Sequence, residues 1–290
     1  MKRRNRENNL SAYLFILPSI LMFLLFVLYP IILSCVYSFQ NRSLTTAKWV
    51  GFANYKDIFT DPSFWLALKN TALFVIILVP VCILAGFNTA LRVNKLSPRL
   101  RGFFRTVFYL PSVLSGVVMS MIWKWIFDPS FGLLNYLMEL LGLNPVVWMA
   151  SPGTIYYLMI VVFTFNFGTV LIIYMSAVDG IPEEILEAAR IDGAKPSTIK
   201  WKIIVPLLKP TTFFVMVTQT IAVFQTWVVI QMLTNGGPAR STETLVFQIY
   251  REAFSFNQFG RASALGMVLL VIIVLMTVLQ KLYAGNDVEY

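Results

Sequence analysis

The sequence contains no histidine, only two cysteines, and charged residues at just 13% of its 290 positions. Without histidine the chain has no Ser-His-Asp triad, HExxH zinc site or histidine proton relay. Cys35 and Cys82 both lie inside apolar runs, where small buried hydrophobic side chains are expected rather than a disulfide framework. These absences remove the commonest hydrolytic and metal-dependent reactions from consideration.

Acidic residues are also missing from the interior of every long apolar run. The polar side chains found there are neutral: Asn88, Thr164, Asn166, Thr169, Gln219, Gln225, Thr226 and Gln231. An ion-coupled carrier usually keeps an ionisable residue or an ion site at membrane depth. An intramembrane hydrolase or lipid transferase needs a catalytic dyad or acidic metal ligands there. Both classes are therefore disfavoured, whereas amide and hydroxyl groups suit a neutral, hydroxyl-rich solute.

The sequence has no GxxxxGK[ST] loop for nucleotide phosphates. The nearest fragment, Gly193–Ser197, lacks the leading glycine and has a proline directly after its lysine. We therefore expect this chain to hold no cofactor and to catalyse no reaction. If the protein transports a solute actively, the energy enters from another polypeptide.

Apolar side chains are abundant, at 58% of positions, against about 45–50% in soluble domains. About 20 apolar residues in a helix cross a hydrocarbon core of about 30 Å. Six runs meet this length, at residues 13–37, 66–91, 106–127, 155–178, 211–233 and 262–282. The sequence therefore predicts an all-α polytopic membrane protein with six transmembrane helices, in which residues 1–290 form a single transmembrane domain.

Basic residues give the chain a formal net charge of +9, and they lie in the short segments between apolar runs. Membrane topology places them there, so nucleic-acid binding is not expected. Six spans put both termini on one side of the membrane, and that side carries fifteen lysines and arginines against eight on the other. The Arg92–Arg105 segment, which has no acidic residue, belongs to the richer side. The positive-inside rule therefore predicts that both termini and residues 180–209 are cytoplasmic.

Residues 180–209 are the only long stretch rich in charge. Pro182 suits the first position of a helix, and the two glutamates after it suit the positive end of the helix dipole. Gly193 fits a C-terminal cap, and Pro196 can begin a second short helix that leads to Pro206. The pattern predicts a helix–glycine–helix loop. These features alone fit either an amphipathic linker resting on the membrane or a docking surface for another protein.

The spacing inside this loop resembles the EAA motif of ABC importer permeases, E-A-A-x3-G-x9-I-x-L-P. The matching residues are Glu187-Ala188-Ala189, Gly193 after three residues, and Ile203-Ile204-Val205-Pro206 after nine more, with Val205 the only departure. Five further segments are similar to carbohydrate-type permeases: Leu17-Pro18-Ser19, Gly51–Tyr55, Asn70-Thr71, Asn235–Pro238 and Gly260–Ala264. The Asn-Gly-Gly-Pro turn resembles the first permease of such a pair, of the maltose, glycerol-phosphate and lactose type. The chain lacks the extra N-terminal spans and large outer loop of the larger maltose permease subunit.

The resemblance implies a multi-pass permease subunit of a bacterial ABC importer, located in the cell membrane, that carries a sugar, oligosaccharide or polyol. Its partners would be a second, related permease, two cytoplasmic ATPase subunits that bind ATP and magnesium, and an extracytoplasmic solute-binding protein. The first helix of the loop would couple to an ATPase subunit by sitting in a groove on it. The residues assigned to this docking are Glu183, Glu184, Glu187, Ala188, Ala189, Arg190, Asp192, Gly193, Ala194 and Pro206. A permease for a polyamine or phosphate ester, or an ion-coupled carrier, is the alternative.

In the resembled family, the helices that flank this loop line the solute cavity; here they are residues 155–178 and 211–233. The candidate solute contacts are Asn166, Thr169, Gln219, Gln225, Thr226 and Trp227. Amide and hydroxyl groups can hydrogen-bond sugar hydroxyls, and an indole can stack on a sugar face. Each of these side chains could instead make a packing contact between helices.

Overall fold

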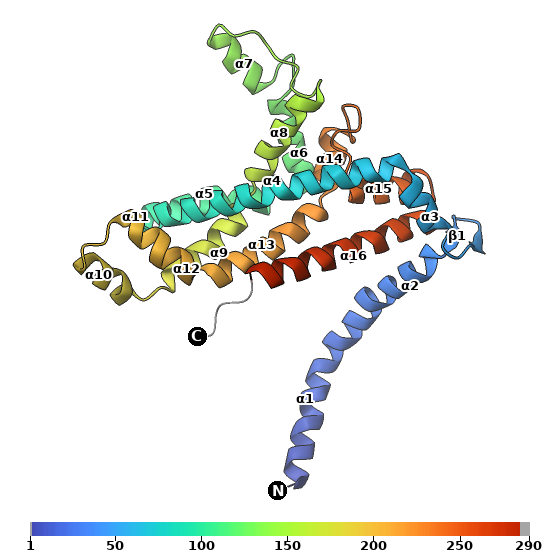
Figure 1. Ribbon diagram of the computed structural model, residues 1–290, viewed down its shortest axis with the longest axis horizontal. Helices are drawn as coiled ribbons and strands as arrows, with labels where there is room; N and C mark the ends of the chain where they lie inside the picture. The colour runs from blue at the N-terminus through green and yellow to red at the C-terminus, as the bar shows by residue number, and fades with distance from the viewer. Residues whose placement is uncertain (1, 285–290) are drawn as a thin grey trace. The chain divides into compact units, whose positions relative to one another are not determined.

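The structure, a computed structural model, describes residues 2–284, with side chains from residue 13 to residue 283. Most of the described chain is helical, as predicted for an all-α protein (Figure 1). It divides into two compact units. One comprises the chain up to Pro62 together with Ile249–Leu270, and the other comprises Ser63–Gln248 together with the chain from Val271 onward.

The first unit begins with a long helix in which α1 (Lys2–Phe23), a π-helical turn (Leu24–Leu28) and α2 (Tyr29–Ser38) follow one another without a break. The π-turn ends two residues before Pro30, which has no N–H to donate, and the N–H of Tyr29 donates to the carbonyl of Leu24, five residues back. The stretch Tyr13–Ser38 is apolar enough to cross a membrane. The segment predicted as the first span, 13–37, is therefore helical throughout.

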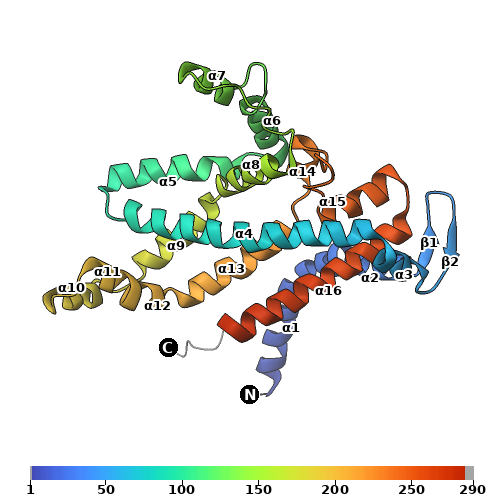
Figure 2. The same ribbon diagram turned by 45° about the horizontal axis from the view of Figure 1, so that its top comes forward.

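The rest of this unit brings together two of the motifs noted in the sequence. It contains β1 (Gln40–Arg42) paired antiparallel with β2 (Ala47–Trp49), α3 (Ala53–Thr60), a π-turn (Arg251–Ser255) and the start of α16 (Phe259–Ala284), and Figure 2 shows the hairpin. Asn54 donates to the carbonyls of Ser38 and Gln40 at 2.8 and 2.9 Å. A Cβ on Gly260 would lie 1.9 Å from the Gln40 carbonyl oxygen. A glycine is therefore required where α16 begins against this turn.

The second unit is organised around α4, which lies antiparallel to α5 (Figures 1 and 2). The remaining helical elements of the chain are α4 (Pro62–Val93), α5 (Pro98–Val113), α6 (Gly116–Ile126), α7 (Leu133–Leu140), α8 (Pro152–Thr164), α9 (Gly168–Asp179), α10 (Glu183–Ile191), α11 (Pro196–Ile199), a π-turn (Lys200–Ile204), α12 (Val205–Leu207), α13 (Lys209–Phe224), α14 (Val228–Leu233) and α15 (Leu245–Tyr250). Helix α9 packs against both α5 and α13, and α6 packs against α14.

Two apolar clusters form the core of this unit, and α4 contributes to both. One cluster joins α4, α6, α8 and α14 around Phe74, Met159 and Ile230. The other joins α4, α9 and α13 around Val170 and Val215. Half of the most apolar stretch of α4 is buried within the protein, so α4 is an interior helix of this unit.

Three of the predicted spans are not continuous helices, and those predictions are wrong in this respect. Span 106–127 is divided between α5 and α6, whose axes are bent by 100°, and span 155–178 between α8 and α9, bent by 45°. Span 211–233 ends as a helix at Phe224 and resumes as α14. The segment Pro196–Leu207 also meets α13 at 67°. Among the described residues, three unbroken helices are long and apolar enough to cross a membrane, or up to six if each bent pair is one span.

Local chemistry explains the sharpest of these breaks. Pro111 lies in the last turn of α5, and Leu114 after it is extended, with φ −72° and ψ 142°. Ser115 then caps α6 by accepting a hydrogen bond from the N–H of Val118 at 3.3 Å. Mean hydropathy reports the apolar composition of a stretch and not its hydrogen-bond pattern. A proline followed by a serine cap therefore divides an apolar run that looks continuous by composition.

Candidate functional site

The first half of the 180–209 loop is a capped helix with the polarity predicted from its sequence. Pro182 is the N-cap of α10, one residue before the first helical position predicted for it. Glu183 and Glu184 occupy the first turn, and Arg190 lies in the last turn. This arrangement places charge favourably at both ends of the helix dipole. The short helix is thereby stabilised by groups of its own sequence.

The predicted glycine cap is confirmed in detail. Gly193 has a φ of +78°, and its N–H donates to the carbonyl of Arg190 at 3.0 Å. The N–H of Ala194 donates to the carbonyl of Ala189 at 3.0 Å. These two bonds form a Schellman motif, which ends a helix and turns the chain sharply. The turn leads into α11, which begins at Pro196 as predicted.

The outer surface of α10 combines acidic, small and apolar residues that face solvent. Ile191 is 86% exposed and Ile185 is 42% exposed. The exposed residues among those assigned to docking are Glu183, Glu184, Glu187, Ala188, Arg190, Asp192, Gly193 and Pro206, whereas Ala189 is buried and Ala194 is half-buried. A single exposed isoleucine is unremarkable in itself. Two of them beside small residues form a surface that another protein can approach closely.

The loop is tied to α4, to Asn94 directly after α4 and to α5, and the sequence reasoning missed these ties. Before the loop, Asp179 accepts hydrogen bonds from Arg101, with which it also forms an ion pair, and from Asn94 at 3.1 Å. Within the second half of the loop, Lys200 donates to Asn88 of α4 at 2.8 Å. The available signal was a carboxylate at the end of an apolar run, facing a basic segment without acidic residues.

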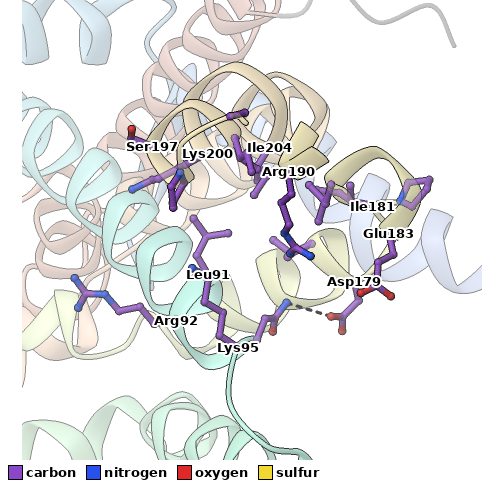
Figure 3. A pocket seen from close by; sticks show the side chains of 18 of the residues that line it. Leu91, Arg92, Lys95, Asp179, Ile181, Glu183, Arg190, Ser197, Lys200 and Ile204 are labelled. Carbon is purple, nitrogen blue, oxygen red and sulfur yellow. Dashed lines mark hydrogen bonds between the residues drawn. The ribbon is translucent and has the colours of Figure 1, made fainter. Parts of the chain in front are cut away.

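A pocket of about 1170 Å³ lies between the loop and the ends of α4 and α9 (Figure 3). Its walls carry both signs of charge, from Arg92, Lys95, Arg190 and Lys200 and from Asp179, Glu183 and Glu184. The side chain of Arg190 points into it from α10. Among the described residues, no group of three or more cysteines and carboxylates could hold a metal ion.

The candidate solute contacts lie at two of the helix breaks. Asn166 lies between α8 and α9, and the first turn of α9 contains Thr169; both are exposed. Gln225, Thr226 and Trp227 separate α13 from α14, and Gln219 lies within α13.

The bonding of two candidates favours a packing role. Trp227 packs against the core cluster around Phe74 and Ile230. The Thr226 hydroxyl donates to the carbonyl of Ala222 in its own helix at 3.0 Å. Gln225, by contrast, is exposed.

The break between α5 and α6 lies next to each of the other two helix breaks. A Cβ on Gly168, the first residue of α9, would lie 2.4 Å from the carbonyl oxygen of Phe108 and 2.8 Å from the hydroxyl of Ser112. On the other side, a Cβ on Gly116 would lie 3.4 Å from the side chain of Val228. The α5–α6 break therefore adjoins both the α8–α9 break and the α13–α14 break. Broken helices in membrane proteins persist where they are buried in protein or line a cavity.

Three buried polar atoms have no hydrogen-bond partner among the described residues: Ser112 Oγ in the last turn of α5, Thr164 Oγ1 at the end of α8, and Trp123 Nε1 within α6. Leaving such atoms unpaired is costly, so they mark places where water or a polar ligand can bind. Thr164 stood out in the sequence only as a neutral polar group in an apolar run. In the sequence Ser112 is indicated only as a small residue at four-residue spacing from Gly116 and Ser120, which suits close helix packing, and Trp123 carries no local signal. Only the break makes their polar atoms significant.

Long apolar helices, three of them unbroken, together with breaks that adjoin one another, define a polytopic membrane protein. The family model described as "Binding-protein-dependent transport system inner membrane component" matches residues 80–285. The chain belongs to this family and is a permease component of an ABC transporter, which is a transport subunit rather than an enzyme.

Several curated relatives match nearly the whole chain. The probable ABC transporter permease protein YesP of Bacillus subtilis (strain 168) is 34% identical over 96% of this chain and 91% of its own length. The lactose transport system permease protein LacF of Rhizobium radiobacter is 33% identical, covering 97% and 96% respectively. The sn-glycerol-3-phosphate transport system permease protein UgpA of Agrobacterium fabrum is 30% identical, covering 98% and 97%.

The fold has been seen before. The crystal structure of a bacterial alginate ABC transporter in complex with an alginate pentasaccharide-bound periplasmic protein contains a chain that superposes with a TM-score of 0.83. The match covers 96% of this chain and 95% of that chain at 23% identity. At this identity the likeness concerns the fold alone.

Proposed function

We propose that this chain is one of two permease subunits of an ATP-driven importer for a sugar, oligosaccharide or polyol. In this proposal residues 1–290 form one transmembrane domain with six spans, of which the bent helices form part, and both termini are cytoplasmic. Membership of the binding-protein-dependent family supports the transporter class. The solute class is supported by relatives named for lactose and glycerol 3-phosphate that align along nearly the whole chain.

The observation that carries the proposal is the 180–209 loop. A helix closed by a Schellman motif projects acidic and apolar side chains into solvent, beyond the ends of helices that are suited to lipid. This geometry fits a helix that docks into a groove of a soluble ATPase subunit. The proposed contacts are the exposed residues of α10 and the Asp192–Ala194 turn.

The hydrogen bonds of Asp179, just before the loop, and of Lys200, within it, can pass a movement of the docked helix to the membrane helices. Asp179 is held by Arg101 and Asn94, and Lys200 by Asn88. A displacement of α10 is therefore passed to α4, the helix that contributes to both core clusters. Coupling between distant sites requires an element that can adopt two arrangements, and each site must shift the equilibrium between them. The proposed partners are a second permease, two ATPase subunits that bind ATP and magnesium, and an external solute-binding protein.

The solute path is proposed to pass the adjoining helix breaks. The candidate contacts there are neutral, which favours a neutral polyhydroxylated solute over a polyamine. A phosphate ester is the second candidate, because one relative is named for glycerol 3-phosphate. A bound phosphate ester is expected to recruit a lysine or arginine, and none of the candidate contacts carries a positive charge.

Co-purification tests the proposal directly. The tagged chain is extracted from its host in mild detergent, its companions are identified by mass spectrometry, and ATP hydrolysis is measured with and without the solute-binding protein. We expect a second permease, an ATPase subunit and stimulated hydrolysis. The binding protein is then titrated with neutral sugars, polyols and glycerol 3-phosphate. A chain that purifies alone and still moves solute in liposomes without ATP would overturn the proposal in favour of an ion-coupled carrier.

A further inference from the structure

Two short sequence motifs, Asn70-Thr71 and Asn235–Pro238, lie outside the 180–209 loop, and hydrogen bonds join the segments that contain them in the second unit. Asn70, on α4, is 2% exposed. Its amide nitrogen donates to the carbonyls of Arg240 and Glu243, both at 3.0 Å, and its amide oxygen accepts from the hydroxyl of Tyr156 at 2.8 Å. One buried amide therefore joins α4, α8 and the segment Thr234–Thr244, which contains Asn235-Gly236-Gly237-Pro238. We call this segment the NGGP loop.

Thr71 extends the junction by one residue. Its hydroxyl is fully buried, donates to the carbonyl of Ala67 at 2.7 Å, and accepts the N–H of Leu245 at 3.0 Å. Leu245 is the first residue of α15, immediately after the NGGP loop. Asn70 and Thr71 thus fix both the body and the end of this loop by bonds that water cannot replace.

The NGGP loop has a conformation that needs such support. Ala239 and Arg240 have φ values of +47° and +60°, which L-residues with side chains rarely adopt. Glu243 is 1% exposed and accepts from Arg240 Nε at 2.6 Å, and Arg240 also donates to Ser63 at 2.8 Å. Strained backbone of this kind persists when the surroundings over-determine it. The loop is therefore a rigid element rather than a loose connection.

The rigid loop reaches the proposed solute path through one further bond. The Thr244 hydroxyl donates to the carbonyl of Thr226 at 3.3 Å. Thr226 lies in the α13–α14 break, where the helix has ended and its last carbonyls lack partners within it. The position of the break is thus linked through Thr244 to Thr71 and Asn70.

We propose that Asn70, Thr71 and Thr244 are positioning residues for solute translocation: they hold the α13–α14 break in the geometry that binds solute. This inference rests on the proposed function, because it takes the breaks to line the solute path. It assigns a role to the Asn70-Thr71 and Asn-Gly-Gly-Pro segments that the docking loop does not explain. A purely structural role predicts a different outcome in the following experiment.

The experiment uses the assembled transporter in liposomes, with Thr244→Val and Thr71→Val as isosteric variants and Thr244→Ser and Thr71→Ser as conservative ones. Thr277→Val is the matched control, since its hydroxyl bonds only the Ile273 carbonyl of its own helix at 2.9 Å. Transport is measured against the concentration of solute-loaded binding protein. Separately, Gln225→Cys in a Cys35→Ala, Cys82→Ala background reports the break through its rate of maleimide labelling.

We expect both valine variants to raise the half-saturating concentration about three- to tenfold, the effect of losing the one hydrogen bond by which each hydroxyl reaches another element, from Leu245 N–H to Thr71 and from Thr244 to the Thr226 carbonyl. The amount of assembled complex and the maximal rate should stay near normal. Labelling at position 225 should change at least about threefold in the same variants, and the serine variants and Thr277→Val should behave as the parent.

Two results overturn the proposal. Unchanged half-saturation and labelling in both valine variants would show that the bonds do not position the break. A fall in complex yield with unchanged labelling would show that they serve folding alone. Because labelling is measured on the chain itself, a parent transporter that moves no sugar would count against the proposed function, while the labelling result would still decide the positioning role.

Discussion

Gly193 combines a left-handed backbone with open surroundings. Its φ is +78°, and a Cβ placed on it would meet nothing within 4 Å. Gly193→Val therefore destabilises the turn after α10 by about 1–2 kcal/mol, because valine disfavours the left-handed backbone and not because its side chain clashes. We expect this variant to lose about fivefold or more of ATPase association and uptake, while the thermal unfolding of the membrane helices is unchanged.

Gly193→Asn is the matched control, because asparagine tolerates the left-handed region. It should retain most of the association and uptake measured by co-purification and transport. Normal association and uptake in the valine variant would contradict a docking role for the turn.

Ser112, at the α5–α6 break, carries a buried hydroxyl with no hydrogen-bond partner in the part of the chain that the structure describes. Removing an unpaired buried hydroxyl should not destabilise the protein, and relief of its desolvation favours stability by up to about 1–3 kcal/mol. If the hydroxyl serves the solute, Ser112→Ala should weaken transport while the melting temperature is maintained or raised. Ser120→Ala is the comparison, since the Ser120 hydroxyl already donates to Gly116 at 2.6 Å. Equal transport in the two variants would remove Ser112 from the solute path.

At the scale of elements, the close approach of α9 to α5 depends on Gly168. A methyl group there would lie 2.4 Å from the Phe108 carbonyl oxygen, which is backbone and cannot move aside cheaply. Gly168→Ala should therefore destabilise the second unit by about 1–3 kcal/mol, seen as a lower unfolding temperature in detergent. Gly102→Ala, on α5 where a Cβ meets nothing within 4 Å, should be neutral or slightly stabilising. If both variants melt alike, α5 and α9 do not pack as described.

The elements that the sequence predicted well are those governed by local rules. The proline at 182, the two glutamates after it and Gly193 define α10 almost to the residue, because helix capping depends on neighbouring residues. The segment predicted as the sixth span, 262–282, lies within α16, an unbroken helix. In both cases a short window of sequence contains the information needed.

The helix breaks were missed because apolar content does not reveal where a helix changes direction. Gln225 and Trp227 lie in the apolar run 211–233, which contains no proline or glycine. The helix nevertheless stops there. The structure shows that the Thr226 carbonyl is bonded by Thr244, eighteen residues later. The bonds that Asp179 accepts from Asn94 and Arg101, and the bond that Lys200 donates to Asn88, are likewise long-range. Such partners cannot be read from spacing along the chain.

At the scale of the whole molecule, the orientation in the membrane is the prediction that most needs a direct test. Ser197, on α11, and Glu139, on α7, are both exposed, and Figures 1 and 2 show these two helices well separated within the second unit. In cells, an impermeant maleimide should label Glu139→Cys and leave Ser197→Cys unmodified. Inverted vesicles should give the reverse pattern. Labelling of position 197 in intact cells would overturn the predicted topology.

The π-turn at Lys200–Ile204 overlaps the end of the nine-residue interval between Gly193 and the second half of the EAA motif, and continues into that second half. A π-turn accommodates one residue more than an α-helix of the same rise, and one residue amounts to about 100° of rotation at 3.6 residues per turn. The number of residues in this interval therefore sets the direction in which Pro206 faces relative to Gly193. Deleting a single residue here could leave a regular helix intact and yet turn Pro206 to another side of the axis. Homologous chains should consequently vary in residue identity within this interval far more freely than in its number of residues.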